Sequence, residues 1–209
     1  PFSSQLLLAR VRNLIDSHQR LKQFFGDRQT LAKEDICDLD KDFVDAVYQL
    51  CAEKDIRVIA DEEQTGVART GKILAGAWYS RKADITTLAK GIAGGIPMGA
   101  CLFNEKTMNV LVPGTHGSTF GGNPIACAGG IAVINRITGD GFLDEVNGKA
   151  SYIKSKLEEC SAVQSVSGLG LVLGIPLSDK SGKAADIAKQ AFERGLLGLT
   201  ATEKVRLLP

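Results

Sequence analysis

Two short apolar runs, each followed directly by a charged residue, constrain the fold of this chain more than any other feature. Residues 56–60 run into Asp61, and residues 84–89 run into Lys90. A helical pattern precedes each run, and this alternation is typical of α/β proteins with a mainly parallel sheet and flanking helices. Ligands of such proteins gather at the carboxyl ends of the strands. The sequence therefore predicts that Asp61 and Lys90 lie at that edge of the sheet.

Helical periodicity and capping signals predict three further elements. Apolar residues recur at three- and four-residue steps over residues 4–25, which is the period of an amphipathic helix. Asp40 precedes a second helical pattern as its N-cap. Asn123 and Pro124 begin a third helix that continues to Ile137, because Asn is a good cap and Pro is tolerated at the first helical position.

The last third of the chain reads as a smaller unit of mixed type. Residues 142–160 and 184–194 have helical patterns, and residues 163–177 between them are strand-like and rich in glycine. We expect residues 1–138 to belong to a large α/β domain and residues 139–209 to form a smaller α+β domain.

Two glycine patterns imitate nucleotide-binding motifs. Residues 66–72, G-V-A-R-T-G-K, follow a strand as a phosphate loop does, but Ile73 stands where that loop needs a hydroxyl for magnesium. Residues 168–174, G-L-G-L-V-L-G, carry the third glycine one position late for a dinucleotide fingerprint and lie in strand-like sequence. We interpret the first pattern as a glycine-bounded loop and the second as a place of close backbone packing.

Three other motifs form a more specific pattern. Residues 61–66 read D-E-E-Q-T-G, residues 88–91 read L-A-K-G, and residues 114–124 read G-T-H-G-S-T-F-G-G-N-P. Singly, each has an ordinary explanation, such as a turn acid or a solvated charge. Together they resemble the class III pyridoxal-phosphate aminotransferases, and among these the acetylornithine aminotransferases, where the same motifs occur in this order. The resemblance extends from about residue 38 to residue 209.

The resemblance implies pyridoxal-phosphate fold type I and a role for each motif residue. Lys90 would form the Schiff base with the cofactor aldehyde, which requires an uncharged amine. Asp61 would face the ring nitrogen and favour its protonated form, and Gln64 would bind the ring hydroxyl. Ser118 and Thr119 would bind the cofactor phosphate, with Thr119 reaching into the neighbouring subunit of a homodimer.

The closing segment, K-V-R-L-L-P at residues 204–209, resembles the family segment whose arginine binds a substrate carboxylate. Arg206 would do this with two parallel N–H donors. Strand alternation places Val205 and Leu207 on the opposite face, which leaves the guanidinium free to point into a cleft. Without the resemblance, Arg206 would be interpreted as an ordinary edge-strand cation.

The reaction implied by the resemblance is the transfer of an amino group from N-acetylornithine to 2-oxoglutarate, a step of arginine biosynthesis. Ornithine, succinylornithine and 4-aminobutyrate remain open as amino donors.

The sequence also departs from the family pattern. It has no Ser-Gly-Thr-Glu phosphate turn, no ring-stacking aromatic residue and no E-P-x-x-G-E-G-G segment, and we expect residues 1–36 to be a helical segment that does not match the family. Glu63 stands where the family has Val or Ile against the ring, and a carboxylate there costs desolvation free energy unless it turns away or is paired. Ser167 replaces an arginine found in many relatives. A non-catalytic, truncated or degenerate relative that keeps the fold and the dimer interface is therefore a second hypothesis.

Composition excludes several other functions. The 25 Lys and Arg residues nearly balance the 24 Asp and Glu residues, so no overall field favours nucleic acid or an anionic membrane. No apolar run reaches the roughly 18–20 residues of a membrane span, and His18 and His116 have no neighbours at metal-ligand spacing. The five cysteines form no C-x-x-C pair, and no secretory signal is visible, so we expect a reducing, cytoplasmic compartment and no metal. Because the chain begins at Pro1 and stops inside a strand-like segment, we expect it to be an excerpt.

Overall fold

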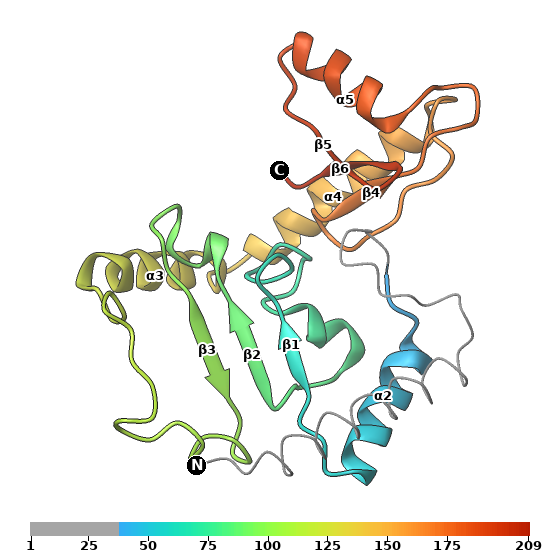
Figure 1. Ribbon diagram of the computed structural model, residues 1–209. Helices are drawn as coiled ribbons and strands as arrows, with labels where there is room; N and C mark the ends of the chain where they lie inside the picture. The colour runs from blue at the N-terminus through green and yellow to red at the C-terminus, as the bar shows by residue number, and fades with distance from the viewer. Residues whose placement is uncertain (1–37) are drawn as a thin grey trace. The chain divides into compact units, whose positions relative to one another are not determined.

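The computed structural model describes residues 38–209, so the helix predicted over residues 4–25 lies outside the described part. The described elements, with η for a 3₁₀ helix, are α2 (Lys41–Glu53), β1 (Ile59–Asp61), η2 (Ala75–Tyr79), β2 (Ile85–Leu88), η3 (Lys90–Ala93), β3 (Ala100–Phe103), α3 (Pro124–Ile137), α4 (Phe142–Glu158), β4 (Leu173–Ile175), α5 (Ala184–Glu193), β5 (Leu199–Ala201) and β6 (Lys204–Leu207). They include two three-stranded sheets, one in the order β1-β2-β3 and one in the order β4-β6-β5 (Figure 1). None of the helices in this part of the chain is long and apolar enough to cross a membrane.

The first sheet is mixed rather than mainly parallel. β1 pairs with β2 in parallel, with Asp61 opposite Thr87, whereas β2 and β3 are antiparallel. The predicted mainly parallel sheet is therefore only partly right within residues 38–209. The connection over residues 62–84 is long enough for a crossover, but residues 89–99 contain only one short 3₁₀ helix, and so short a connection reverses the chain.

Asp84 joins the amino end of β2 to both neighbouring strands. Its carboxylate accepts hydrogen bonds from the backbone N–H of Val58 at 2.9 Å and from the side-chain amide of Asn104 at 2.8 Å. Its backbone carbonyl accepts a third from the hydroxyl of Thr107, also at 2.8 Å. Val58 precedes β1 and Asn104 follows β3, so one residue fixes the same end of all three strands. The first strand begins at Ile59, later than the predicted run, and Asp61 is its last residue.

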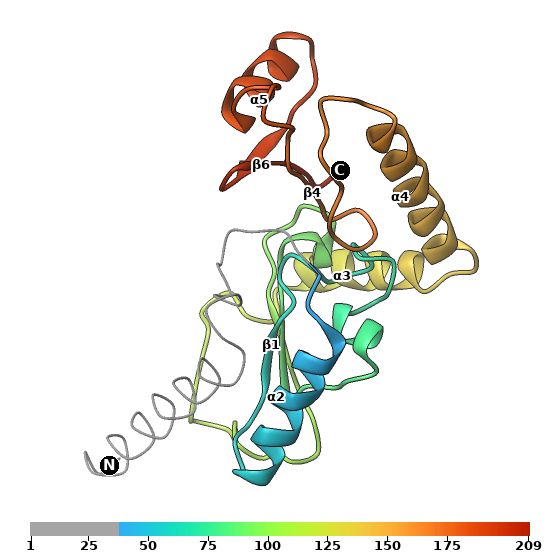
Figure 2. The same ribbon diagram turned by 90° about the vertical axis from the view of Figure 1, so that its right-hand side faces the viewer.

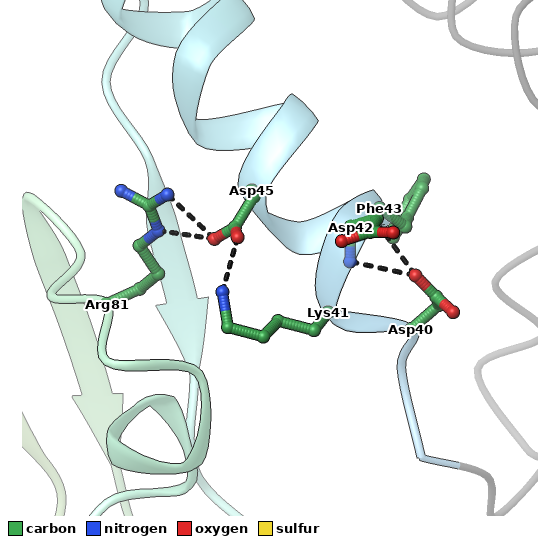
Figure 3. Close-up of polar contacts among 6 residues, drawn as sticks. All are labelled: Asp40, Lys41, Asp42, Phe43, Asp45 and Arg81. Carbon is green, nitrogen blue, oxygen red and sulfur yellow. Dashed lines mark hydrogen bonds and ion pairs between the residues drawn. The ribbon is translucent and has the colours of Figure 1, made fainter.

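Asp40 caps α2 as predicted. Its carboxylate accepts hydrogen bonds from the backbone N–H groups of Asp42 at 2.8 Å and Phe43 at 3.2 Å (Figure 3). One turn later, Asp45 accepts hydrogen bonds from Lys41 and from Arg81, and these bonds hold the pKa of Asp45 below its usual value. The Arg81 contact attaches α2 to the segment between η2 and β2, on the β1 side of the sheet (Figure 2).

The α3 helix also begins as predicted. The Asn123 side chain accepts hydrogen bonds from the backbone N–H groups of Ile125 at 2.9 Å and Ala126 at 3.3 Å, and Pro124 is the first helical residue. The helix packs against η3, and Gly129 brings the backbones close, because a Cβ there would lie 3.0 Å from the Ala93 carbonyl oxygen. This contact covers a small core formed by residues Leu88, Ile92 and Ala93 with Val67, Leu74, Ile96, Met98 and Ala100 around them.

The C-terminal elements agree with the predicted helix and strand types. Helices α4 and α5 match the predicted ranges within two residues, and α5 packs against β5 and β6. Only residues 173–175 of the strand-like stretch form a named strand; Val163 and Ser167 make isolated bridges with Leu177 and Gly174. A separate domain that begins near residue 139 stays a prediction.

Gly170 ties two segments that lie far apart in the sequence. Its φ is +53°, and a Cβ there would lie 2.6 Å from the carbonyl oxygen of Thr70 and 2.7 Å from the nitrogen of Gly71. Leu171 donates its backbone N–H to the carbonyl of Arg69 at 2.9 Å. The interpretation of this glycine pattern as close backbone packing is confirmed. The stretch after residue 72 forms the short 3₁₀ helix η2, so the loop before it lacks the α-helix that a phosphate loop needs.

The Asp84 cluster predicts a pH dependence of stability. The Val58 N–H, more than any other group, lowers the pKa of Asp84, so its ionised form stabilises the fold above about pH 4. That stabilisation is lost as the pH falls through the folded pKa. We expect the free energy of unfolding to fall more steeply between about pH 5 and pH 2 in the wild type than in Asp84→Asn, measured by urea denaturation. The exposed control Asp179→Asn should keep the wild-type slope, and parallel curves for Asp84→Asn and wild type would contradict the prediction.

Candidate functional site

The structure places Asp61 and Lys90 at the carboxyl ends of two neighbouring parallel strands. Asp61 ends β1 opposite Thr87 of β2, and one Asp61 carboxylate oxygen accepts a hydrogen bond from the Thr87 hydroxyl at 3.3 Å. The same oxygen accepts the backbone N–H of Glu63 at 3.2 Å. Lys90 follows the end of β2 and begins η3. The parallel register therefore brings a carboxylate and a primary amine to one edge of the sheet.

Lys90 makes an ion pair with Glu63. The Nζ atom of Lys90 lies 3.0 Å from Oε2 of Glu63, and the two side chains are 52% and 45% exposed. Sequence reasoning identified Glu63 as a costly carboxylate unless it turned away or was paired, and in the structure it is paired. The carboxylates of Asp61 and Glu63 and the ammonium of Lys90 thus form one charged group at the strand ends.

The backbone at Lys90 is strained. Its φ is +53°, in the left-handed region that non-glycine residues seldom adopt. The preceding residue, Ala89, is extended, so the chain turns sharply between the end of β2 and the start of η3. Strain of this kind is held by the surrounding structure and often marks functional sites, which singles out Lys90 among the lysines of the described residues.

Glu62 holds the turn that follows β1, and sequence reasoning missed this role. Its side chain is buried, with 4% exposure, and accepts hydrogen bonds from the Thr65 hydroxyl at 2.5 Å and from the backbone N–H groups of Ala75 at 3.0 Å and Gly76 at 2.9 Å. Its backbone N–H donates to Thr87 at 3.0 Å. An acid followed three residues later by threonine, directly after a strand, was the available signal, because such a pair forms a local hydrogen bond.

The other predicted cofactor residues differ in their placement. Gln64 is exposed within the turn that Glu62 holds, so it lies in the same turn as Glu63. Ser118 and Thr119 lie in the exposed loop between β3 and α3. Across residues 38–209, no hydrogen bond or ion pair joins this loop to Asp61 or Lys90. The structure thus places Asp61 and Lys90 at one sheet edge, and hydrogen bonds or ion pairs join neither Gln64 nor the two hydroxyl residues to them within the described residues.

Arg206 does not lie on a sheet edge. Its strand, β6, is the central strand of the second sheet, and Arg206 pairs with Gly174 on one side and Leu199 on the other. The interpretation as an edge-strand cation is therefore wrong. The Nε atom of Arg206 is buried and has no hydrogen-bond partner within the described part of the chain. Buried polar atoms are seldom left unpaired, so this donor is suited to a ligand acceptor.

The residue types at the strand ends suit carbonyl and amine chemistry rather than metal chemistry. Among residues 38–209, no group of three or more His, Cys, Asp or Glu residues is arranged to hold a metal ion. A primary amine can bind an aldehyde, and a carboxylate at the same sheet edge can hold a protonated ring nitrogen. These residues therefore fit the ring and aldehyde end of pyridoxal phosphate.

In comparisons with known protein families, residues 36–209 match the family described as aminotransferase class-III. The acetylornithine aminotransferase of Haemophilus ducreyi is 43% identical over 174 residues, which cover 83% of this chain and 44% of that protein. The solved structure of acetylornithine aminotransferase from Elizabethkingia anophelis matches this chain with a TM-score of 0.72 and 35% identity. The matched region covers 81% of this chain and 46% of that one. The ornithine aminotransferase of Toxoplasma gondii, solved with pyridoxal phosphate at partial occupancy in its active site, has a TM-score of 0.72 and 29% identity, over 80% and 41% of the two chains. The chain spans less than half of the length of these relatives.

The buried Glu62 carboxylate predicts a large effect of its removal. Glu62→Ala leaves the N–H groups of Ala75 and Gly76 and the Thr65 hydroxyl without their acceptor. We expect the free energy of unfolding, measured by urea denaturation, to fall by about 2–4 kcal/mol. The neighbouring variant Glu63→Ala should lose less than about 1 kcal/mol, because its ion pair is half exposed. Equal losses in the two variants would show that Glu62 does not hold the turn.

Proposed function

Because the chain belongs to the class-III aminotransferases, we propose that it carries the Schiff-base lysine of an enzyme that moves an amino group to 2-oxoglutarate. Its fold is that of the pyridoxal-phosphate-dependent aminotransferases, known as fold type I. The observation that carries the proposal is the meeting of Asp61 and Lys90 at the ends of β1 and β2. The C-terminal elements around β6 are, in this proposal, most of a smaller α+β domain.

Lys90 and Asp61 would share the chemistry at the cofactor ring. Pyridoxal phosphate, when bound, supplies an aldehyde that takes up the amino group and a ring that withdraws electrons. Lys90 Nζ would hold the aldehyde carbon and, as a free amine, would accept and return the α-proton of the substrate. Asp61 holds a proton on the ring nitrogen through its carboxylate. Gln64, in the adjoining turn, binds the ring hydroxyl.

Ser118 and Thr119 would bind the cofactor phosphate, Thr119 across the interface of a homodimer. Their loop precedes α3, whose capped N-terminus favours negative charge. Exposed apolar side chains flank the loop, among them Phe120 at 83% and Ile125 at 70% exposure. Apolar groups exposed in this way are typical of surfaces that contact another protein chain. This exposure supports a second copy of the chain as the partner of the loop.

Arg206 would bind the carboxylate that the amino donor and 2-oxoglutarate share. Its buried, unpaired Nε supports this role, because a carboxylate accepts both Nε and a terminal N–H of the guanidinium in parallel. Gly174, its neighbour on β4, has no side chain to occupy the same face. Of its two cross-strand neighbours, only Leu199 on β5 carries a side chain beside the guanidinium.

N-acetylornithine is the amino donor we propose, with a related ω-amino donor as the alternative. Relatives from Haemophilus ducreyi and Caldanaerobacter subterraneus, the latter 45% identical over 162 residues, are named acetylornithine aminotransferases, which supports this choice. The enzyme would then act in arginine biosynthesis, in the cytoplasm. The second candidate, a non-catalytic relative, is favoured by Glu63, a charged residue where the family resemblance implies an apolar one.

Lys90→Ala should abolish the Schiff base. Wild-type protein mixed with pyridoxal phosphate should turn yellow, and borohydride should then fix the label on the peptide that contains Lys90. In Lys90→Ala both signals should vanish, and amino transfer should fall by at least about 10²–10⁴-fold, the usual contribution of a positioned acid–base group. Lys82→Ala, an exposed control, should behave as wild type. Labelling of a different lysine in the wild type would refute the assignment.

Arg206→Lys should damage substrate binding without affecting the cofactor. A lysine offers no planar two-donor fork, so kcat/KM for both the amino donor and 2-oxoglutarate should fall about 10- to 100-fold, while cofactor affinity stays unchanged. Steady-state kinetics with each substrate varied in turn measures this. Arg194→Lys, at the exposed end of α5, is the matched control. An unchanged kcat/KM for both substrates would exclude the role.

A further inference from the structure

Glu63 lies at the strand ends in an ion pair with Lys90, and the proposed function gives it no role. Its carboxylate lies 3.0 Å from Lys90 Nζ, and its backbone N–H donates to Asp61 at 3.2 Å. Glu63 is thereby fixed to the two residues that the proposed function assigns to the cofactor ring. Its side chain therefore influences the lysine directly.

We propose that Glu63 is a positioning residue that restrains Lys90. The carboxylate holds the Nζ atom of Lys90 in an ion pair at 3.0 Å, so that the lysine binds an aldehyde more slowly and less completely than it would beside an uncharged residue. This inference rests on the proposed role of Lys90. It adds a positioning residue to that site, because the Glu63–Lys90 ion pair must separate before the Schiff base forms.

The chemistry of Schiff-base formation determines whether the ion pair slows or speeds the reaction. Schiff-base formation joins the lysine nitrogen to the aldehyde carbon, and the aldehyde oxygen leaves as water. The nitrogen must use its lone pair, so the ammonium first gives up one proton to solvent. A lysine nitrogen that is bound to a carboxylate at 3.0 Å cannot attack until that contact separates, so the ion pair opposes the step. If Glu63 instead accepted the proton and assisted attack, its removal would slow the reaction.

Exposure of the two side chains limits the size of the effect. Lys90 is 52% and Glu63 45% exposed, so solvent screens their attraction. Exposed ion pairs of this kind change an equilibrium by about two- to fivefold. Asp61 remains nearby in any Glu63 variant and keeps one negative charge at the strand ends. The expected gain on removal of Glu63 is therefore modest but measurable.

The test compares wild type with Glu63→Gln and Glu63→Val in protein expressed from the complete gene. Each is mixed with pyridoxal phosphate and, separately, with pyridoxal, which lacks the phosphate charge. The absorbance of the Schiff base is followed in time and to equilibrium. Both variants should react about two- to fivefold faster and more completely with both aldehydes. Raising salt from about 0.05 to 0.5 M should speed the wild type and leave the variants nearly unchanged, because salt screens the ion pair.

A matched control is available on α4. Glu145 makes an ion pair with Lys149 at 2.6 Å, with side chains 52% and 60% exposed, so Glu145→Gln removes an equivalent charge and contact from a pair that includes neither Glu63 nor Lys90. It should leave the rate and extent of Schiff-base formation at wild-type values.

Peptide mapping after borohydride reduction distinguishes a failure of the proposed function from a failure of the proposed restraint by Glu63. Absence of label on Lys90 in the wild type and in both variants would overturn the proposed function and, with it, the restraint. Label on Lys90 with equal or slower reaction in Glu63→Gln would overturn the restraint alone. A gain with pyridoxal phosphate but none with pyridoxal would also overturn it, because that result reports repulsion of the phosphate rather than release of the lysine.

Discussion

The parallel pairing of β1 with β2 is the constraint on which the candidate site depends. Only a parallel pair delivers both carboxyl ends to one edge of a sheet, and its register sets Asp61 beside Thr87, so that Lys90 follows on the next strand. Side chains hold both ends of this pair. The Asp84 carboxylate binds the backbone N–H of Val58 where the strands begin, and the Glu62 carboxylate holds the turn that follows β1 by binding the N–H groups of Ala75 and Gly76. Two carboxylates without an assigned chemical role, those of Asp84 and Glu62, thus support the strand pair that carries Asp61 and Lys90.

Features with a local cause could be predicted from sequence. Asp40 and Asn123 cap helices because a short polar side chain before an apolar period satisfies free N–H groups within three residues. The strand ends at Asp61 and Lys90 follow from apolar runs that stop at a charge. The motif letters identified candidate site residues for a similar reason, since each motif is a continuous stretch of chain.

Features that depend on distant contacts could not be predicted. The antiparallel course of β3 follows from the short path between residues 89 and 99, whereas sequence alternation alone favours parallel strands. The Glu63–Lys90 ion pair joins residues from two connections, and the central place of Arg206 depends on which strands flank β6. In each case the deciding partner is remote in sequence, so no pattern of nearby residues contains it.

The contact at Gly170 has a consequence for how the chain is made. Thr70 and Gly71 leave the ribosome long before Gly170, yet their backbone is packed against a glycine that admits no side chain. Bringing two such distant segments together costs loop-closure entropy that local contacts do not repay. The part of the loop around Thr70 and Gly71 therefore reaches its final packing only after Gly170 has been synthesised. Completion of this loop is in this sense a late event in biogenesis, and it depends on a residue about a hundred positions further along the chain.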